Sequence, residues 1–188
     1  MSNIKTKLSF LSKEQCKNII EFSNKNLELE KGKIFNDNEI QYNDSRKSSV
    51  GYSNYKDDYP NLVFDILDLI NKEIKIKDCI AVESKIDLNF QFTKYEINEY
   101  FDWHTDSSKK NSITGRYFTI VIQLNDDYEG GDLIIKDEND KEFIIEKGCG
   151  NITIFPSSFW HKVTPIIKGI RYTLVNWYPI KKEKISML

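Results

Sequence analysis

The strongest constraint on the fold is a hydrophobic pattern of period two in the second half of the chain. Residues 86–93 and 117–124 alternate strongly apolar residues with other types, as strands do when their two faces meet different surroundings. Shorter strand-like segments follow, separated by turns that contain glycine, at 132–136, 142–146, 151–155, 161–166 and 170–178. Many short strands joined by such turns predict antiparallel sheets that close into a sandwich or barrel.

The glycines also predict how the last strands connect. Lys168 and Gly169 lie between segments 161–166 and 170–178, so a turn there would join the two segments as a hairpin. In that arrangement the side chains that begin the two strands would share one face of the sheet, because residues two apart in a strand point the same way.

The first third of the chain carries helical patterns instead. Ser12 and Gln15 have the spacing of a capping box, in which each side chain accepts a hydrogen bond from the other residue's backbone. The polar residues 24–58 indicate mostly loop with short strands. Pro60 suits the first turn of a second helix, and apolar residues at helical spacing follow it, namely Val63, Ile66, Leu67, Ile70 and Ile74.

These patterns predict one domain over residues 1–188 that is mainly β with flanking helices. We expect a double-stranded β-helix, or jelly roll, at residues 86–180, with helical support at residues 1–85 packed outside it. A length of 188 residues is typical of one domain, and no linker or repeat divides the chain.

Composition narrows the classes of function. The formal net charge is only −2, whereas a duplex-DNA binder normally carries a basic face, so we do not expect a nucleic-acid partner. The three cysteines are too far apart for a disulfide framework or a CxxC zinc site. The start lacks a signal-peptide pattern, and no apolar run reaches the ~20 residues of a membrane helix. We therefore expect a cytoplasmic location and no membrane partner, and the oligomeric state stays open.

The chain contains two histidines, and their positions carry the main functional hypothesis. His104 and Asp106 are two residues apart, so in an extended segment both side chains point to one side. His161, on a neighbouring strand of a closed barrel, would complete a set of two imidazoles and one carboxylate. Such a set leaves three positions of an octahedron for a bidentate 2-oxo acid and O2, which suits non-haem Fe(II). An isolated His-x-Asp is a weak signal, since most such matches are surface accidents.

Arg171 would hold the far end of the co-substrate. A guanidinium binds a carboxylate through two parallel hydrogen bonds and stays charged, which suits the distal carboxylate of 2-oxoglutarate. Without the histidines, a surface ion pair would be the simpler interpretation of this arginine.

The same half of the chain resembles the catalytic domain of the prolyl 4-hydroxylase branch of the Fe(II)/2-oxoglutarate oxygenases, including small phage and bacterial members. Its motifs keep the family's order and spacing over about residues 86–178, and they include Phe101-Asp102-Trp103-His104-Thr105-Asp106. The matching stretches are 90–95, 100–106, 116–119, 123–126, 128–133, 155–157, 161–165 and 169–172, ending at Trp177.

The resemblance implies roles for further residues. Tyr95 would place its hydroxyl on 2-oxoglutarate, and Thr119 and Gln123 would line the co-substrate pocket. Thr173 would support Arg171 from the same strand. Ordinary packing in the barrel would also explain Tyr95 and Thr173.

The activity implied by the resemblance is hydroxylation of a C–H bond, with Fe(II), 2-oxoglutarate and O2, and with ascorbate as a supporting reductant. A proline in a protein or peptide is the substrate expected from the family alone. Arg46, Tyr52, Tyr55 and Tyr59 could contact such a peptide at the barrel opening. The alternatives are hydroxylation of a free amino acid, a small metabolite or a nucleobase, a zinc hydrolase, and a non-catalytic metal-binding interaction domain.

Overall fold

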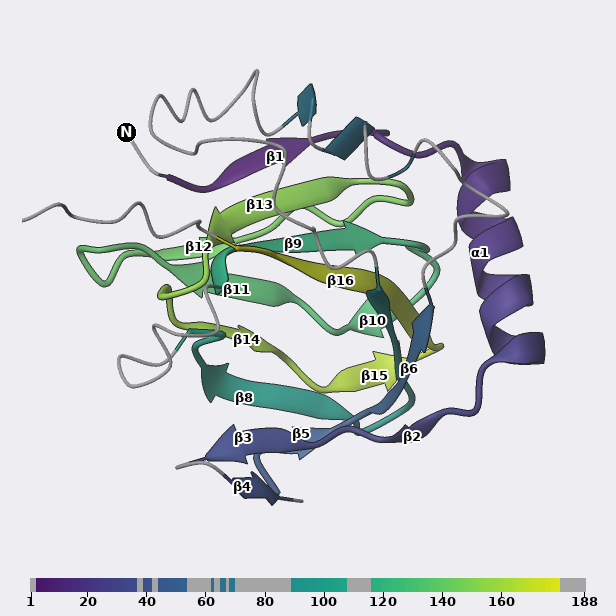
Figure 1. Ribbon diagram of the computed structural model, residues 1–188, viewed down its shortest axis with the longest axis horizontal. Coiled ribbons are helices and arrows are strands. Elements are labelled where there is room, and N and C mark those ends of the chain that lie inside the picture. The colour runs from purple at the N-terminus through teal and green to yellow at the C-terminus, as the bar shows by residue number, and fades with distance from the viewer. Residues whose placement is uncertain are drawn as a thin grey trace, which may run out of the picture.

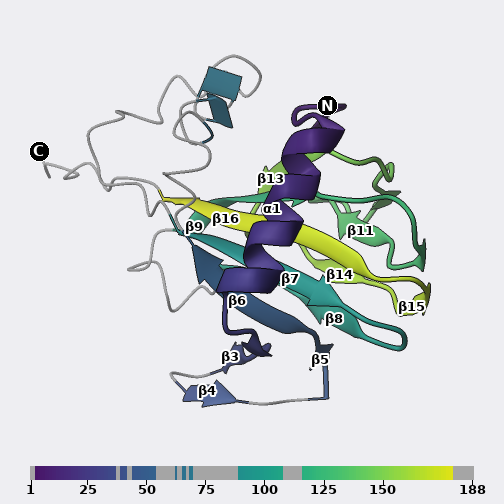
Figure 2. The same cartoon turned by 90° about the vertical axis from the view of Figure 1, so that its right-hand side faces the viewer.

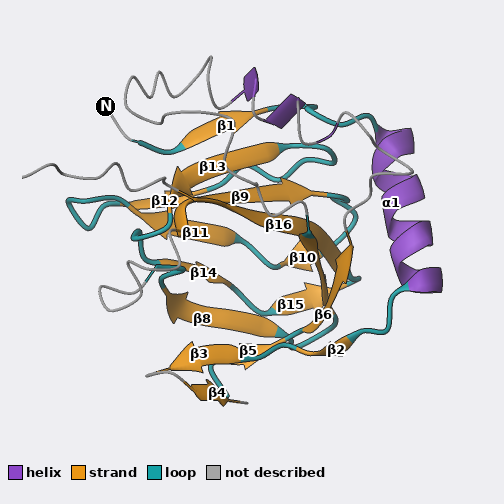
Figure 3. Ribbon diagram, in the orientation of Figure 1, coloured by secondary structure: helices purple, strands orange, loops and turns teal. Residues whose placement is uncertain are grey.

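The computed structural model describes most of the second half of the chain and parts of the first. The described residues are 3–36, 39–41, 44–53, 62, 65–66, 68–69, 89–107 and 116–179. Two antiparallel sheets dominate these residues (Figures 1 and 3). Side chains of both sheets meet in one apolar cluster, in which Val121 and Phe155 of one sheet join Leu133 and Ile135 of the other. This architecture confirms the predicted jelly roll.

The larger sheet has seven strands and the smaller has five. In spatial order, the seven are β1 (Lys5–Lys7), β13 (Ile152–Pro156), β9 (Arg116–Gln123), β16 (Arg171–Pro179), β7 (Phe90–Tyr95), β6 (Ser49–Ser53) and β2 (Glu30–Lys31). The five, again in spatial order, are β12 (Glu142–Ile144), β11 (Leu133–Lys136), β14 (His161–Val163), β8 (Tyr100–His104) and β5 (Arg46–Lys47). Two small ribbons pair β10 (Glu129–Gly130) with β15 (Ile166–Lys168), and β3 (Ile34–Asn36) with β4 (Glu39–Gln41).

The outer face of the seven-stranded sheet packs against α1 (Lys13–Asn26), which lies across it in Figure 2. Alternate residues of the central strands, among them Phe92, Ile122 and Leu174, form one buried cluster with Cys16 and Ile19 of the helix. This face therefore supplies the main apolar core, and the opposite face of the same strands points toward the five-stranded sheet.

Helical residues lie at both predicted places. The capping box at the start of α1 is present, since Ser12 Oγ accepts from Gln15 N at 3.1 Å and Gln15 Oε1 accepts from Ser12 N at 2.8 Å. Residues 62, 65–66 and 68–69 are helical, and Leu62, Ile66 and Leu69 are buried in the main core. Pro60 itself and Val63, Leu67, Ile70 and Ile74 lie outside the described residues. Among the described residues, no helix combines the length and apolarity needed to cross a membrane.

The predicted hairpin of segments 161–166 and 170–178 is wrong. β14 pairs with β11 and β8 in the five-stranded sheet, whereas β16 pairs with β7 and β9 in the seven-stranded sheet. The first segment is interrupted by Pro165, which has no N–H for a strand ladder, and β15 then pairs with β10. Gly169, with a φ of 78°, turns the chain before β16. His161 and Arg171 therefore come from opposite sheets.

Candidate active site

One part of the inner face of the seven-stranded sheet is polar, whereas Val121 and Phe155 on the same face join the apolar cluster between the sheets. Strand register places Tyr95 opposite Arg171, and Thr173 between Thr93 and Gln123. All five are buried, with Tyr95 the most exposed at 4%. Buried hydroxyl, amide and guanidinium groups are costly unless they form hydrogen bonds or bind a ligand. This polar part of the inner face is therefore suited to a polar ligand rather than to an apolar core.

An irregularity in β8 aligns His104 with the second histidine. His161 pairs with His104, but Val163 pairs with Phe101, so β8 has one more residue than β14 between the two pairs. A bulge of this kind redirects side chains. The rings of Phe101 and His104 stack with their centroids 3.4 Å apart, and Phe101 packs with Val163 in a buried cluster.

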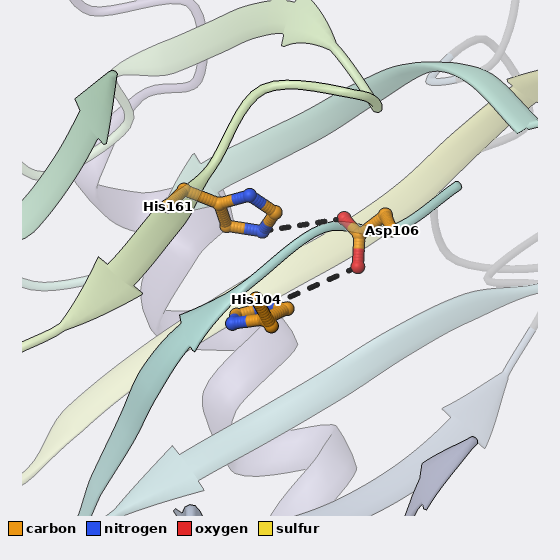
Figure 4. Close-up of side chains that lie close together, drawn as sticks. All are labelled: His104, Asp106 and His161. Atoms are coloured by element: carbon orange, nitrogen blue, oxygen red, sulfur yellow. Dashed lines mark ion pairs between the residues drawn. The ribbon is translucent and has the colours of Figure 1, made fainter. Parts of the chain in front are cut away.

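His104, Asp106 and His161 point toward one another (Figure 4), and their possible ligand atoms all lie within 4.8 Å of each other. His161 Nε2 is 3.4 Å from Asp106 Oδ2, and His104 Nε2 is 3.8 Å from Asp106 Oδ1. The three side chains predicted to bind iron are therefore brought together by the end of β8 and the start of β14.

Both imidazoles turn Nε2 toward this point because their other nitrogen is engaged. His104 Nδ1 lies 2.8 Å from the carbonyl oxygen of Asp102, and His161 Nδ1 lies 2.9 Å from that of Phe159. A carbonyl oxygen only accepts, so each Nδ1 carries a hydrogen and Nε2 of the neutral ring offers a lone pair. Burial, with a smaller contribution from His161, lowers the pKa of His104 to about 3.

Asp106 is held in place through its backbone and its side chain. Its N–H donates to the Ser157 carbonyl oxygen at 2.9 Å, and the Thr119 hydroxyl donates to Oδ2 at 2.7 Å. Burial alone would raise the pKa of Asp106, but a hydrogen bond from His161 and the attraction of the His161 and His104 rings in their protonated forms outweigh burial and hold that pKa below its usual range. The carboxyl group is therefore ionised at neutral pH.

This donor set fits a divalent metal ion. Two imidazole lone pairs and an ionised carboxylate facing one another in a buried place repel unless a cation lies among them. Hydrogen bonds from the far nitrogen of each histidine to a carbonyl are typical of metal ligands. Within the described residues, no fourth His, Cys, Asp or Glu joins the group, so it matches the open facial set of Fe(II) and not a closed structural zinc site.

Arg171 and Tyr95 together fit a carboxylate. Arg171 is 2% exposed, its guanidinium carbon lies 5.4 Å from the Tyr95 ring centroid, and its Nε has no hydrogen-bond partner among the described residues. Burial raises the pKa of Tyr95 against the opposing effects of Arg46 and Arg171, so the phenol keeps its proton. A buried arginine donor without a partner, beside a protonated phenol, is what a bound carboxylate would satisfy.

The other predicted residues lie on the same inner face. Gln123 Nε2 donates to the Glu146 carbonyl oxygen at 2.9 Å, and its Oε1 accepts from Tyr128 at 3.4 Å. Thr173 is 1% exposed between its two strand neighbours. Trp177 pairs with Thr119 across the strands; its buried indole N–H makes no regular hydrogen bond within the described part of the chain, but it helps to lower the pKa of Asp106. The predicted roles of Gln123 and Thr173 in co-substrate binding stay predictions.

Ser157 is the residue that sequence reasoning missed, since it falls in a matching motif but had no role predicted for it. It is fully buried, and its hydroxyl lies 2.9 Å from Thr119 Oγ1. Ser157 follows β13 in a turn, where alternation gives no side-chain direction. The one signal in the sequence was a small polar residue directly after an apolar strand and shortly before His161.

Comparisons with known sequences agree with this geometry. Residues 90–179 match a family model described as the 2OG-Fe(II) oxygenase superfamily. The chain is 35% identical to a PKHD-type hydroxylase of Idiomarina loihiensis over 85 residues, which are 45% of this chain and 38% of that protein. It is 38% identical to one of Synechococcus sp. over 82 residues, which are 42% of this chain and 36% of that protein. The match thus spans less than half the length of these curated relatives.

Comparisons with solved structures extend over nearly the whole chain. A prolyl-4-hydroxylase of Pseudomonas putida has a TM-score of 0.70 at 15% identity, covering 97% of this chain and 95% of that one. A prolyl hydroxylase of Trichoplax adhaerens, in complex with a hypoxia inducible factor peptide fragment, has a TM-score of 0.72 at 15% identity. This match covers 96% of this chain and 84% of that one. At this identity the likeness shows a shared fold.

Proposed function

We propose, since residues 90–179 match a family model of the 2OG-Fe(II) oxygenase superfamily, that this chain is an Fe(II)- and 2-oxoglutarate-dependent dioxygenase that hydroxylates a C–H bond. The observation that carries the proposal is the convergence of His104, Asp106 and His161. Fe(II), 2-oxoglutarate and O2 supply the oxidation when bound, giving succinate, CO2 and one oxygen atom inserted into the C–H bond.

In this proposal His104, Asp106 and His161 hold Fe(II) through two Nε2 atoms and a carboxylate oxygen. Support comes from the carbonyl contacts of both Nδ1 atoms, which leave each Nε2 without a proton. These three residues would fix the position of the ion. They would also shield it from water, because the His161 side chain is only 6% exposed and that of Asp106 is 12% exposed.

Arg171 binds the distal carboxylate of 2-oxoglutarate in this proposal, and Tyr95 donates its phenol proton to the same group. Support comes from the Nε of Arg171, for which the described residues provide no hydrogen-bond partner, and from the Tyr95 ring beside it. Thr119, Gln123 and Thr173 lie on the same inner face, where they would border the co-substrate.

The substrate we propose is a proline in an extended peptide or a flexible protein segment. Two structural neighbours are prolyl hydroxylases, and one of them is in complex with a peptide fragment. On this chain Tyr52 lies directly across from Gln91 of the inner face, donates to its Oε1 at 3.0 Å and is 59% exposed. It offers a peptide an exposed aromatic surface on β6, next to the edge strand β2.

Arg46 is a second residue that could contact such a peptide. Its guanidinium lies over Phe101, whose ring stacks on His104, and it is anchored by Ser48 Oγ at 2.9 Å and the Lys33 carbonyl oxygen at 3.0 Å. A fixed guanidinium beside the metal ligands would suit a peptide carbonyl. Tyr55 and Tyr59, which were predicted to contact the peptide too, lie outside the described residues.

We expect oxidation of a proline-containing peptide when the protein is given Fe(II), 2-oxoglutarate and O2, with ascorbate as the proposed supporting reductant. Parallel reactions contain free proline, other free amino acids or single-stranded oligonucleotides. Mass spectrometry would measure the gain of one oxygen atom, and succinate would be quantified in the same samples. Succinate coupled to 4-hydroxyproline in a peptide is the expected result.

Two controls sharpen this test. A Tyr52→Ala protein should hydroxylate the peptide less well but retain its affinity for 2-oxoglutarate, because Tyr52 lies away from Arg171. Coupled turnover only with a free amino acid, a small metabolite or a nucleobase would reject the peptide substrate and leave the oxygenase assignment intact. We also propose that the protein acts in the cytoplasm and that its partner is the protein or peptide that it hydroxylates.

A further inference from the structure

We propose that Ser157 and Thr119 form a hydroxyl relay that keeps Asp106 a monodentate ligand of the metal ion, bound through one carboxylate oxygen. This inference rests on the proposed function, since it concerns how many positions of a bound Fe(II) stay open. Ser157 and Thr119 are positioning residues in it, because they act through Asp106.

The direction of the relay follows from its hydrogen bonds. Thr119 Oγ1 donates its only proton to Asp106 Oδ2 at 2.7 Å. The contact of 2.9 Å between Thr119 Oγ1 and Ser157 Oγ must then be donated by Ser157, because a hydroxyl has one proton to give. The proton donors therefore run in one order, from Ser157 through Thr119 to Asp106.

Ser157 also fixes the backbone of Asp106. Its carbonyl oxygen accepts from the N–H of Asp106 at 2.9 Å and from that of Ser107 at 3.1 Å, while its own N–H donates to the Tyr117 carbonyl oxygen at 2.8 Å. Ser157 and Thr119 are 0% and 1% exposed, so water does not compete for these bonds. One buried residue thus sets both the position of Asp106 and, through Thr119, the rotation of its carboxylate.

The rotation matters because both carboxylate oxygens face the histidines. Oδ1 lies 3.8 Å from His104 Nε2, and Oδ2 lies 3.4 Å from His161 Nε2. A carboxylate that bound an ion through both oxygens would occupy a fourth position of the octahedron. Only two positions would remain, but a bidentate 2-oxo acid and O2 need three. The Thr119 proton on Oδ2 leaves Oδ1 as the oxygen for the ion.

The test compares metal and co-substrate binding in variants of the whole chain, under anaerobic conditions. Thr119→Val keeps the shape of the side chain but removes the donor, so Fe(II) affinity should fall by roughly 10–100-fold, as for other groups that orient metal ligands. At saturating Fe(II), the same variant should also bind 2-oxoglutarate more weakly. Thr119→Ser, which restores a hydroxyl, should recover most of both affinities.

Two further variants keep the inference testable if Thr119→Val does not fold. Ser157→Ala should weaken Fe(II) binding less than Thr119→Val, because Thr119 can still donate to Asp106 but is no longer fixed. The control is Thr153→Val, a buried threonine on the adjacent strand β13 whose hydroxyl contacts Thr6 at 3.1 Å instead; it should bind Fe(II) as the unchanged protein does.

The outcomes separate the relay from the proposed function. If the unchanged protein binds no Fe(II), the proposed function fails and the relay with it. If the unchanged protein binds Fe(II), and both a folded Thr119→Val and Ser157→Ala bind Fe(II) and 2-oxoglutarate equally well, the relay alone is overturned.

Discussion

Replacing His161 by alanine should lower the affinity for Fe(II) by more than about 100-fold, beyond what the loss of a merely supporting group costs. The change removes one of the three proposed ligands, and among the described residues no other His, Cys, Asp or Glu is close enough to replace it. His104→Ala and Asp106→Ala should have comparable effects. Anaerobic titration of the purified protein with Fe(II) measures this, with a stoichiometry of about 1:1 expected for the unchanged chain.

The matched control for this prediction is Lys162→Ala. Lys162 is the next residue of β14, and its side chain points away from the site toward the Trp103 ring, with Nζ 4.6 Å from the ring centroid. Its removal should leave Fe(II) binding unchanged. Full affinity for Fe(II) in a folded His161→Ala protein would contradict the assignment of the three ligands.

Arg171→Ala should raise the KM for 2-oxoglutarate by about 10- to 100-fold while leaving Fe(II) binding nearly intact. A hydrogen bond to a charged group contributes about 1.5–3 kcal/mol, which corresponds to one to two decades of affinity. Only the binding of 2-oxoglutarate should weaken, because Arg171 lies in β16 of the seven-stranded sheet, whereas both histidines lie in the five-stranded sheet. Succinate formation measured over a range of 2-oxoglutarate concentrations gives the KM.

Arg171→Lys serves as the comparison. It keeps the positive charge but loses the planar fork, so its KM should fall between those of the unchanged protein and of Arg171→Ala. An unchanged KM in Arg171→Ala would make Arg171 a bystander, and neither Lys162, whose side chain points away from the site, nor Lys168 is placed to replace it. The latter is a poor substitute, since its side chain is 76% exposed and pairs with Glu129.

Alternation along the chain predicted which face a side chain takes. The alternation in residues 86–93 predicted different surroundings for the two faces of that strand, and Gln91, Thr93 and Tyr95 line the inner face while Phe90 and Phe92 fill the core under α1. The same rule predicted that the side chains of His104 and Asp106, two residues apart, point to one side. Side-chain direction is a local property of the strand backbone, so a single sequence contains it.

The choice of partner strand could not be predicted in this way, because it depends on the path of the chain between strands. The predicted hairpin of segments 161–166 and 170–178 was wrong, because the first strand ends before Pro165 and the chain crosses to the other sheet before β16. The bulge in β8 and the contact of Ser157 with Asp106 likewise arise from tertiary structure. Alternation has no meaning in a turn, so only the fold brings Ser157 to the site.

The central claim is that one bound 2-oxoglutarate molecule reaches both the metal ligands and Arg171. It is tested most directly by adding 2-oxoglutarate to the anaerobic Fe(II)-loaded protein and following the visible charge-transfer absorption that a chelated 2-oxo acid gives with Fe(II). We expect saturable absorption with one 2-oxoglutarate per protein, shifted to higher concentrations in Arg171→Ala and absent in His161→Ala. Protein that binds Fe(II) but shows no such absorption at any 2-oxoglutarate concentration would contradict the claim.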